Sequence, residues 1–209
     1  MNCPNCGAPV NFRWPGAVQT TCPFCRSILV RTDVDLKNVG RIAEPPRDSS
    51  PIQLGTEGQF DKRAFVVVGR IIYEYDQGGW NEWHIIYNDG QSGWLADAQL
   101  EYDVSFWTKP PGPLPLPQQL HRDAILKVGA YTYSVTSITR AHYKSVEGEL
   151  PFQYWDKHDV VFGDLRTTTG EFATIDYSEQ PPLLFTGRAV DFDDLHLRNL
   201  REFEGWQHP

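Results

Sequence analysis

The sequence predicts a mainly β protein in which a cysteine-rich N-terminal ribbon precedes two tandem, related small β-barrel-like modules of the SH3-like kind. Three observations predict this fold class. All four cysteines lie within the first 25 residues, as two Cys-x-x-Cys pairs. Aromatic residues make up 13% of the chain, and 17 Gly and 16 Pro accompany them, as is typical of strands and turns. Short alternating apolar stretches recur between turn signals.

The cysteines predict a bound metal ion. Fifteen residues separate the pair Cys3 and Cys6 from the pair Cys22 and Cys25. Four soft, anionic thiolates at this spacing fill the tetrahedral shell of one structural zinc ion. Iron in a rubredoxin-like site is the main alternative, while disulfides and a thioredoxin-like redox pair fit the pattern less well. A closed four-cysteine shell leaves no position for a reactive water, so we expect the metal to be structural.

The ribbon is expected to span residues 1–32, with short strands over 9–14, 17–21 and 27–32 and a turn at Trp14-Pro15-Gly16. Gly7 follows the first cysteine pair, where a left-handed backbone is often needed. Arg26 follows the second pair, which makes that knuckle less typical. Residues 33–50 form a polar, proline-containing stretch that we interpret as a solvated linker, with a short helical turn near Asp33–Leu36.

Charge and length restrict the function classes. The net charge is −8 over 209 residues. Residues 1–32 carry Arg13, Arg26 and Arg31 and no acidic side chain, so the remainder carries −11. An acidic body disfavours nucleic-acid binding and membrane-surface binding through basic patches. The sequence contains no apolar run long enough to span a bilayer and no signal segment, so we expect a soluble cytoplasmic protein.

The first β module is expected over residues 51–107. A long strand runs from Phe65 to Tyr75, with the odd-numbered apolar residues on one face, and Gly69 marks a bulge or bend. A second strand contains Trp83–Tyr87 and returns through Ser92–Ala96. Asn88-Asp89-Gly90 between them is a strong hairpin signal.

The second β module is expected over residues 121–209, after a proline-rich linker at 108–120 that favours a stiff spacer or covering strap. Strands are expected over 131–136, 160–166, 171–177 and 183–185, and a short helix or irregular tail over 192–203. The segment 65–71 resembles 133–138, and the hairpin 87–96 resembles 166–174. We therefore interpret the two modules as diverged copies, each a curled sheet of four or five strands.

Four segments carry a resemblance to a known family. They are Gly78-Gly-Trp-Asn-Glu-Trp83, Asp89-Gly90…Gly93-Trp-Leu95, the lead-in Ser50–Thr56 and the strand Phe65–Ile71. Together they resemble an uncharacterised bacterial family, domain of unknown function 4178. Members of this family often carry an N-terminal four-cysteine ribbon. The family has no assigned catalytic residue. Its genes are often neighbours of membrane-stress and polyamine-synthase-like genes, so the resemblance implies an accessory role.

The candidate partner-binding residues are aromatic or acidic: Trp80, Glu82, Trp83 and Trp155. Tryptophan is enriched at interaction hot spots, and Gly78-Gly79 places Trp80 near a loop tip. Barrel packing is the competing interpretation, and it fits Trp83 and Trp94 better.

Three function classes follow. The leading hypothesis is a non-enzymatic, zinc-binding adaptor that contacts an unknown protein partner. The second is a nucleic-acid-binding zinc-ribbon protein. The third is an enzyme or small-molecule binder that uses Glu82, His84 or His158, although no nucleophile accompanies these residues.

Overall fold

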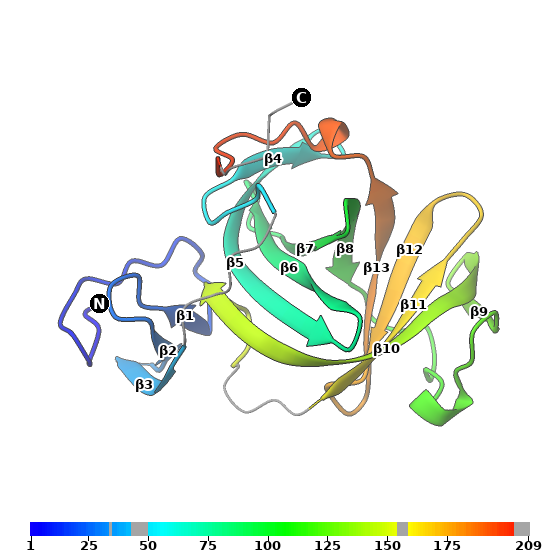
Figure 1. Cartoon of the computed structure of the whole chain (residues 1–209), viewed down its shortest axis with the longest axis horizontal. Helices are drawn as coiled ribbons and strands as arrows, with labels where there is room; N and C mark the ends of the chain where they lie inside the picture. Colours follow the sequence, from blue (N-terminus) through cyan, green and yellow to red (C-terminus); the bar gives the residue numbers. More distant parts are fainter. Residues whose placement is uncertain (34, 43–49, 154–158, 203–209) are drawn as a thin grey trace.

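The protein is mainly β, with a small three-stranded sheet beside a large sheet (Figure 1). The computed structural model describes residues 1–33, 35–42, 50–153 and 159–202. The small sheet has the order β1 (Gln19–Thr21), β2 (Ser27–Arg31), β3 (Leu36–Arg41). The large sheet contains ten antiparallel strands: β4 (Glu57–Phe60), β5 (Arg63–Tyr75), β6 (Gly78–Tyr87), β7 (Ser92–Ala98), β8 (Glu101–Trp107), β9 (Ile125–Val128), β10 (Tyr131–Gly148), β11 (Val160–Arg166), β12 (Glu171–Asp176) and β13 (Leu183–Val190). Two 3-10 turns, η1 (Pro117–Gln119) and η2 (Asp193–Leu195), complete the elements of the described residues.

The large sheet is closed into a ring by two strand pairings between the first half, β4–β8, and the second half, β9–β13. β8 pairs with β13, from Trp107 opposite Phe185 to Tyr102 opposite Val190. β5 pairs with β10, from Glu74 opposite His142 to Gly69 opposite Gly148. The ring therefore runs β5-β6-β7-β8-β13-β12-β11-β10 and returns to β5, and only the short strands β4 and β9 remain as edges. Closure removes the exposed long edges that would otherwise pair with other chains.

The two expected separate modules share this one sheet, so they are not two independent barrels. Each half does contribute five antiparallel strands in the same order, β4–β8 and β9–β13. The segment pairs that resemble each other in sequence lie in corresponding strands, β5 with β10 and the β6–β7 hairpin with the β11–β12 hairpin. The halves join because the long strands β5 and β10 each extend past their own half, and unpaired backbone groups find partners across the junction.

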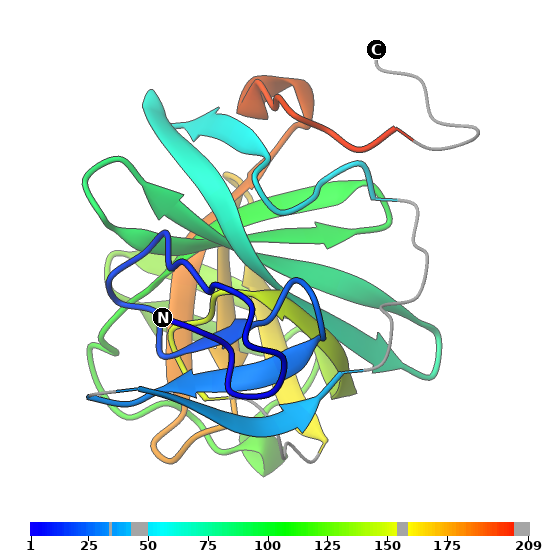
Figure 2. The same cartoon turned by 90° about the vertical axis from the view of Figure 1, so that its left-hand side faces the viewer.

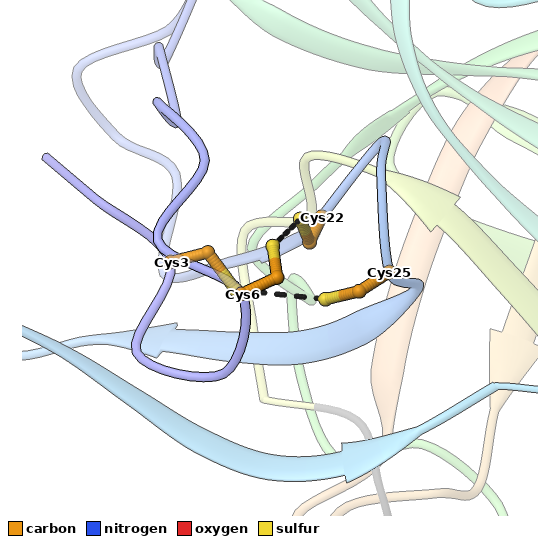
Figure 3. Close-up of side chains that lie close together, drawn as sticks. All are labelled: Cys3, Cys6, Cys22 and Cys25. Carbon is orange, nitrogen blue, oxygen red and sulfur yellow. Dashed lines mark hydrogen bonds between the residues drawn. The ribbon is translucent and has the colours of Figure 1, made fainter.

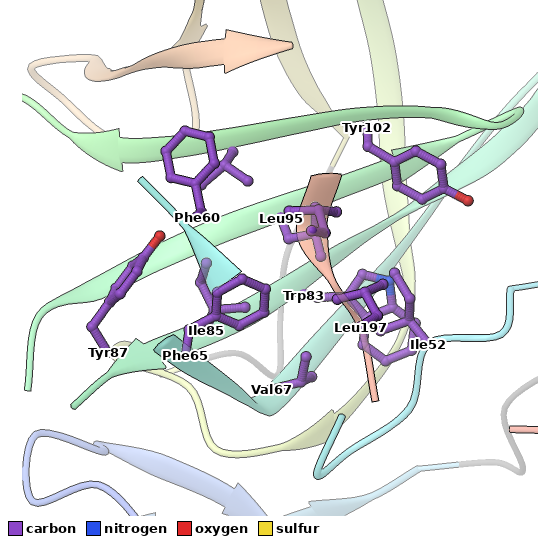
Figure 4. Packing of buried hydrophobic residues seen from close by; sticks show 12 residues of the cluster. Ile52, Phe60, Phe65, Val67, Trp83, Ile85, Tyr87, Leu95, Tyr102 and Leu197 are labelled. Carbon is purple, nitrogen blue, oxygen red and sulfur yellow. The ribbon is translucent and has the colours of Figure 1, made fainter. Parts of the chain in front are cut away.

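Three apolar clusters fill the large sheet. The first-half cluster contains residues of β4–β8 together with Leu195 and Leu197 of the C-terminal segment that crosses it (Figures 1 and 4). The second-half cluster contains residues of β9–β13 together with Leu114 and Leu120. The shared cluster combines both halves: Ile71, Tyr73 and Trp94 with Ala141, Val146, Leu150, Val160 and Phe162.

A bulge lets β5 contribute side chains to two of these clusters. The register of β5 on β6 shifts between Val67 and Gly69, which confirms the bulge expected at Gly69. Phe65 and Val67 pack in the first-half cluster, whereas Ile71 and Tyr73 pack in the shared cluster. The expectation that all of these side chains share one face was therefore wrong, because one extra residue moves every later side chain to the opposite face.

The N-terminal and connecting segments also differ from expectation. β3 lies in the stretch interpreted as a solvated linker and pairs with β2. Residues 9–14 form no strand and make only an isolated bridge between Asn2 and Pro9. The proline-rich segment covers the second half as a strap, because Leu114 packs on its cluster and the Tyr177 hydroxyl donates to the carbonyl oxygen of Pro115 at 2.8 Å. β4, β8 and β9 were not predicted.

The β5–β10 junction depends on a glycine. A Cβ atom added at Gly69 would lie 2.0 Å from the backbone oxygen of Glu149. We expect Gly69→Ala to lose roughly 3 kcal/mol of unfolding free energy, because backbone rather than a flexible side chain must move. Urea unfolding followed by tryptophan fluorescence measures this loss. The matched control is Gly40→Ala in β3, whose Cβ would meet Ile28 Cδ1 at 3.7 Å, and we expect a change within about 0.5 kcal/mol. Equal stability of both variants would contradict the account of the junction.

Candidate metal centre and interior carboxylates

The four cysteine sulfurs converge on one point, as Figure 3 shows. All four Sγ atoms lie within 4.8 Å of one another. Cys3 Sγ lies 3.6 Å from Cys25 Sγ, and Cys6 Sγ lies 3.7 Å from Cys22 Sγ. All four are free thiols. A tetrahedral shell with metal–sulfur bonds of about 2.3 Å places its sulfurs about 3.8 Å apart. Two of the sulfur pairs are therefore at the tetrahedral spacing, and shifts of at most about 1 Å bring the remaining pairs to the spacing of one tetrahedral metal ion.

The two cysteine knuckles have the same backbone geometry. The N–H of Gly7 donates to the carbonyl of Cys3 at 2.8 Å, and the N–H of Arg26 donates to the carbonyl of Cys22 at 2.9 Å. Gly7 has φ +75° and Arg26 has φ +59°. Arg26 thus adopts the left-handed conformation that glycine usually supplies at this position, so the second knuckle matches the first despite its sequence.

The thiols favour a cation at their centre. Hydrogen bonds from Asn5 and Ser27 lower the pKa of Cys25 to about 5. A backbone hydrogen bond from Ala8 lowers the pKa of Cys6, but the loss of surrounding water and the three neighbouring cysteines raise it overall to about 12. Like charges at this separation oppose one another's ionisation. A bound dication would remove this opposition and hold all four sulfurs as thiolates.

Glu149 fastens the cysteine-containing unit to the large sheet. Its carboxylate accepts hydrogen bonds from the backbone N–H groups of Arg13 at 2.7 Å and Trp14 at 2.9 Å. Its own N–H donates to the carbonyl of Val68 at 2.8 Å. The next residue, Leu150, exchanges backbone hydrogen bonds with Gln19 of β1. Figure 2 shows the small sheet lying against the large one at this place. The sequence analysis missed Glu149, since a lone glutamate after a glycine carries no local signal.

The predicted partner-binding residues lie in different environments. Trp83 is 1% exposed within the first-half cluster, so its selection as a partner-binding residue was wrong and the packing alternative holds. Trp80 is partly buried, stacks on Tyr73 with ring centroids 4.7 Å apart, and contacts Phe162. Trp80 also lines a surface cavity of about 340 Å³. Trp155 lies outside the described residues.

Glu82 belongs to the interior of the ring rather than to a surface loop. It lines a cavity of about 50 Å³ whose walls come from seven of the eight ring strands. Its Oε1 accepts a hydrogen bond from Trp80 Nε1 at 3.1 Å. Burial is the main cause that raises the pKa of Glu82 to about 8; the Trp80 hydrogen bond lowers this pKa, and the charges of Asp164, Asp103 and Asp176 raise it. Glu82 is therefore largely protonated at neutral pH.

Two of these interior aspartates have specific partners. Asp103 accepts two hydrogen bonds from the guanidinium of Arg166, at 3.0 and 2.8 Å. Asp164 accepts from the hydroxyls of Ser137 at 2.6 Å and Thr174 at 2.9 Å. Of this acidic interior only Glu82 is a candidate from the sequence, because its members are separated by up to a hundred residues and meet only when the ring closes.

His84 is fully buried, and both of its ring nitrogens are bonded. Nδ1 lies 2.8 Å from the carbonyl of Glu149, so Nδ1 carries the proton, and Nε2 lies 2.8 Å from the hydroxyl of Ser92. Burial lowers the pKa of His84 to about 4. The residue is a structural link between β6 and Glu149. His158 lies outside the described residues.

The fold and the cysteine cluster together define a mainly β protein with a closed antiparallel sheet and an appended unit whose four cysteines could hold a metal ion. Residues 53–192 match the family described as "Domain of unknown function (DUF4178)", and the chain belongs to this family. Neither the curated proteins nor the solved structures contain a match. Within the described residues, no helix has the length and apolar character needed to cross a membrane.

The protonated state of Glu82 predicts a pH dependence of stability. Its pKa is higher in the folded protein than in the unfolded chain, so its contribution is complete below about pH 4.5 and is lost as the pH rises through about 8. His84 acts in the opposite direction, since its depressed pKa adds stability only as the pH rises from about 4 to 6.5. Between pH 6.5 and 8 the Glu82 effect acts without this opposition.

We therefore expect the Tm of the wild-type protein to fall between pH 6.5 and 8, by about 2–4 °C for each kcal/mol lost, and the Tm of Glu82→Gln to stay nearly constant there. Differential scanning calorimetry measures both. Glu74→Gln is the control, because the pKa of this exposed carboxylate is lowered by Lys144, and it should retain the wild-type fall. A fall of the same size in Glu82→Gln would show that Glu82 is ionised throughout.

Proposed function

We propose that the protein is a non-enzymatic adaptor of the cytoplasm, in which a zinc ion folds the N-terminal unit and the large sheet presents a surface to a protein partner. The observation that carries this proposal is the four-thiol cluster. Its geometry fits a closed tetrahedral shell, which supports a structural metal rather than a reactive one. Four free thiols close together also suit a reducing compartment.

The cysteine-containing unit, over its described residues 1–33 and 35–41, depends on the metal for its shape and on Glu149 for its position. Cys3, Cys22 and Leu29 are buried together with Val10 and Leu36, so this unit has a core of five residues. A core of this size rarely suffices for folding without a metal or a disulfide. Zinc is the expected ion because it prefers tetrahedral thiolate shells and has no redox chemistry.

The competing functions receive less support. Arg31 donates to the carbonyl of Pro15 and lies over the Phe12 ring, so this cation is turned toward its own chain instead of forming a basic stripe. His84 cannot reach a substrate without unfolding, because it is 0% exposed. The described part of the large sheet offers concave surfaces with mixed polar and apolar linings, which suit a polypeptide partner.

The zinc assignment predicts one zinc ion per chain in protein purified without chelators. The double variant Cys6→Ser, Cys25→Ser should lose the metal and the protection of backbone amides over residues 8–33, because two ligands and the cation are removed together. Elemental analysis and hydrogen exchange measure these outcomes. Phe24→Ser, which changes an exposed side chain between two ligands, should retain the zinc. Iron in place of zinc, or full amide protection in the metal-free variant, would contradict the assignment.

The adaptor assignment predicts specific partners in extracts of the source cell. Cross-linking followed by mass spectrometry should recover the same cross-linked proteins with wild type and with Phe24→Ser if the large sheet makes the contact. A chain lacking residues 1–32 tests the alternative that the metal-binding unit itself is the contact. Absence of any cross-linked protein above a matched control protein would contradict the adaptor function.

A further inference from the structure

A large cavity lies at one end of the ring, away from the cysteine cluster. It has a volume of about 870 Å³ and is bordered by the β4–β5 turn, the β7–β8 turn, the end of β13 and η2. Phe60, Tyr102 and Phe192 supply aromatic surface, and Tyr102 and Phe192 pack on each other with ring centroids 5.3 Å apart. We call this cavity the end groove. Its size is that of a ligand or peptide site.

An unusual residue stands at the rim of the end groove. Ala98 pairs with Glu101, so Gln99 and Leu100 form a two-residue turn, with φ +54° and +71°. Such turns favour Asn-Gly, because β-carbons are strained at positive φ. Leu100 is nevertheless 85% exposed. It gains little from burial and occupies a strained position, a combination that commonly marks a functional site.

Leu100 also connects two concave surfaces. It lines the end groove on one side and the 340 Å³ cavity that contains Trp80 on the other. Tyr102 likewise lines both. A segment lying in the end groove would therefore pass over Leu100 toward Trp80, which gives the exposed leucine an apolar contact at the centre of the surface rather than at its edge.

The charge of the end groove selects the partner. Asp61 is paired with Arg188, while Arg166 is paired with Asp103 and also lies 3.9 Å from the exposed carboxylate of Glu101. The remaining charged lining residues are Asp191 and Asp194 on the acidic side and Lys62 on the basic side. The groove is thus net negative, in agreement with the chain's overall charge of −8. A complementary partner segment carries positive charge.

We propose that the end groove binds a positively charged polypeptide segment of the partner, with Leu100 as the apolar anchor. This inference rests on the proposed adaptor function and assigns its surface and the chemistry of its partner. The acidic rim attracts lysine and arginine side chains, while Leu100 and the aromatic floor contact the apolar side chains between them.

The test uses two labelled nine-residue peptides, one alternating lysine with leucine and the other alternating glutamate with leucine, and fluorescence anisotropy with the full-length protein. We expect binding of the lysine peptide only, weakening as salt is raised. Leu100→Gly should weaken binding at least about tenfold, yet its Tm should equal or exceed that of wild type, since glycine relieves the strained turn. The double variant Glu101→Gln, Asp194→Asn should weaken binding without changing the fold.

The matched control is Lys62→Gly in the β4–β5 turn, another left-handed position on the same groove, with φ +62°. It relieves the same kind of strain but leaves the anchor and removes a positive charge, so lysine-peptide binding should be unchanged or stronger. A lower Tm for Leu100→Gly would mean that Leu100 has a structural role and overturn the inference. Unchanged binding by this variant, preference for the glutamate peptide, or no binding of either would also overturn it. None of these outcomes decides the adaptor function, which is tested separately by the cross-linking of cellular partners.

Discussion

The contact between Gly69 of β5 and Glu149 just after β10 is the constraint on which the rest of the structure depends. The backbones approach so closely there that a Cβ atom would lie 2.0 Å from the Glu149 oxygen. This approach lets β5 pair with β10, and the pairing closes the ring. It also sets the direction of the Glu149 carboxylate, which accepts the N–H groups of Arg13 and Trp14. The large sheet and the cysteine-containing unit therefore meet at Glu149 and at the adjacent Leu150, which exchanges backbone hydrogen bonds with Gln19 of β1.

This arrangement links the metal centre to the large sheet energetically. The sulfurs fix the knuckles, and the chain between them presents the backbone donors to a carboxylate that is buried. Hydrogen bonds to a charged acceptor are among the stronger ones in proteins, at about 1.5–3 kcal/mol each. Loss of the metal would leave Glu149 buried without ordered donors, which is costly in itself. A metal ion held by the four sulfurs would thus stabilise more of the protein than the cysteine-containing unit alone.

Closing one sheet from two halves has a second consequence, which is the polar interior. The shared cluster is apolar, but the same interior holds Glu82 and three aspartates. Arg166 compensates Asp103, hydroxyl groups bond Asp164, and Glu82 is protonated. Buried polar groups of this kind are tolerated when each is bonded or neutral. Leu100, which combines a positive φ with an exposed apolar side chain, lies instead at the end groove, and this combination motivates the assignment of the binding surface.

The sequence by itself determined the β class, the candidate metal site of four cysteines, the bulge at Gly69 and the hairpin at Asn88-Asp89-Gly90, because each depends on local conformation or on ligand type and spacing. It also identified the family, which the match over residues 53–192 establishes. Only the tertiary structure decided that the two halves form one closed sheet, that Trp83 is core, and that Glu82 faces a shared acidic interior. The physical reason is that strand pairing between distant segments depends on which backbone groups remain unpaired, and a one-residue bulge then decides which cluster each side chain joins.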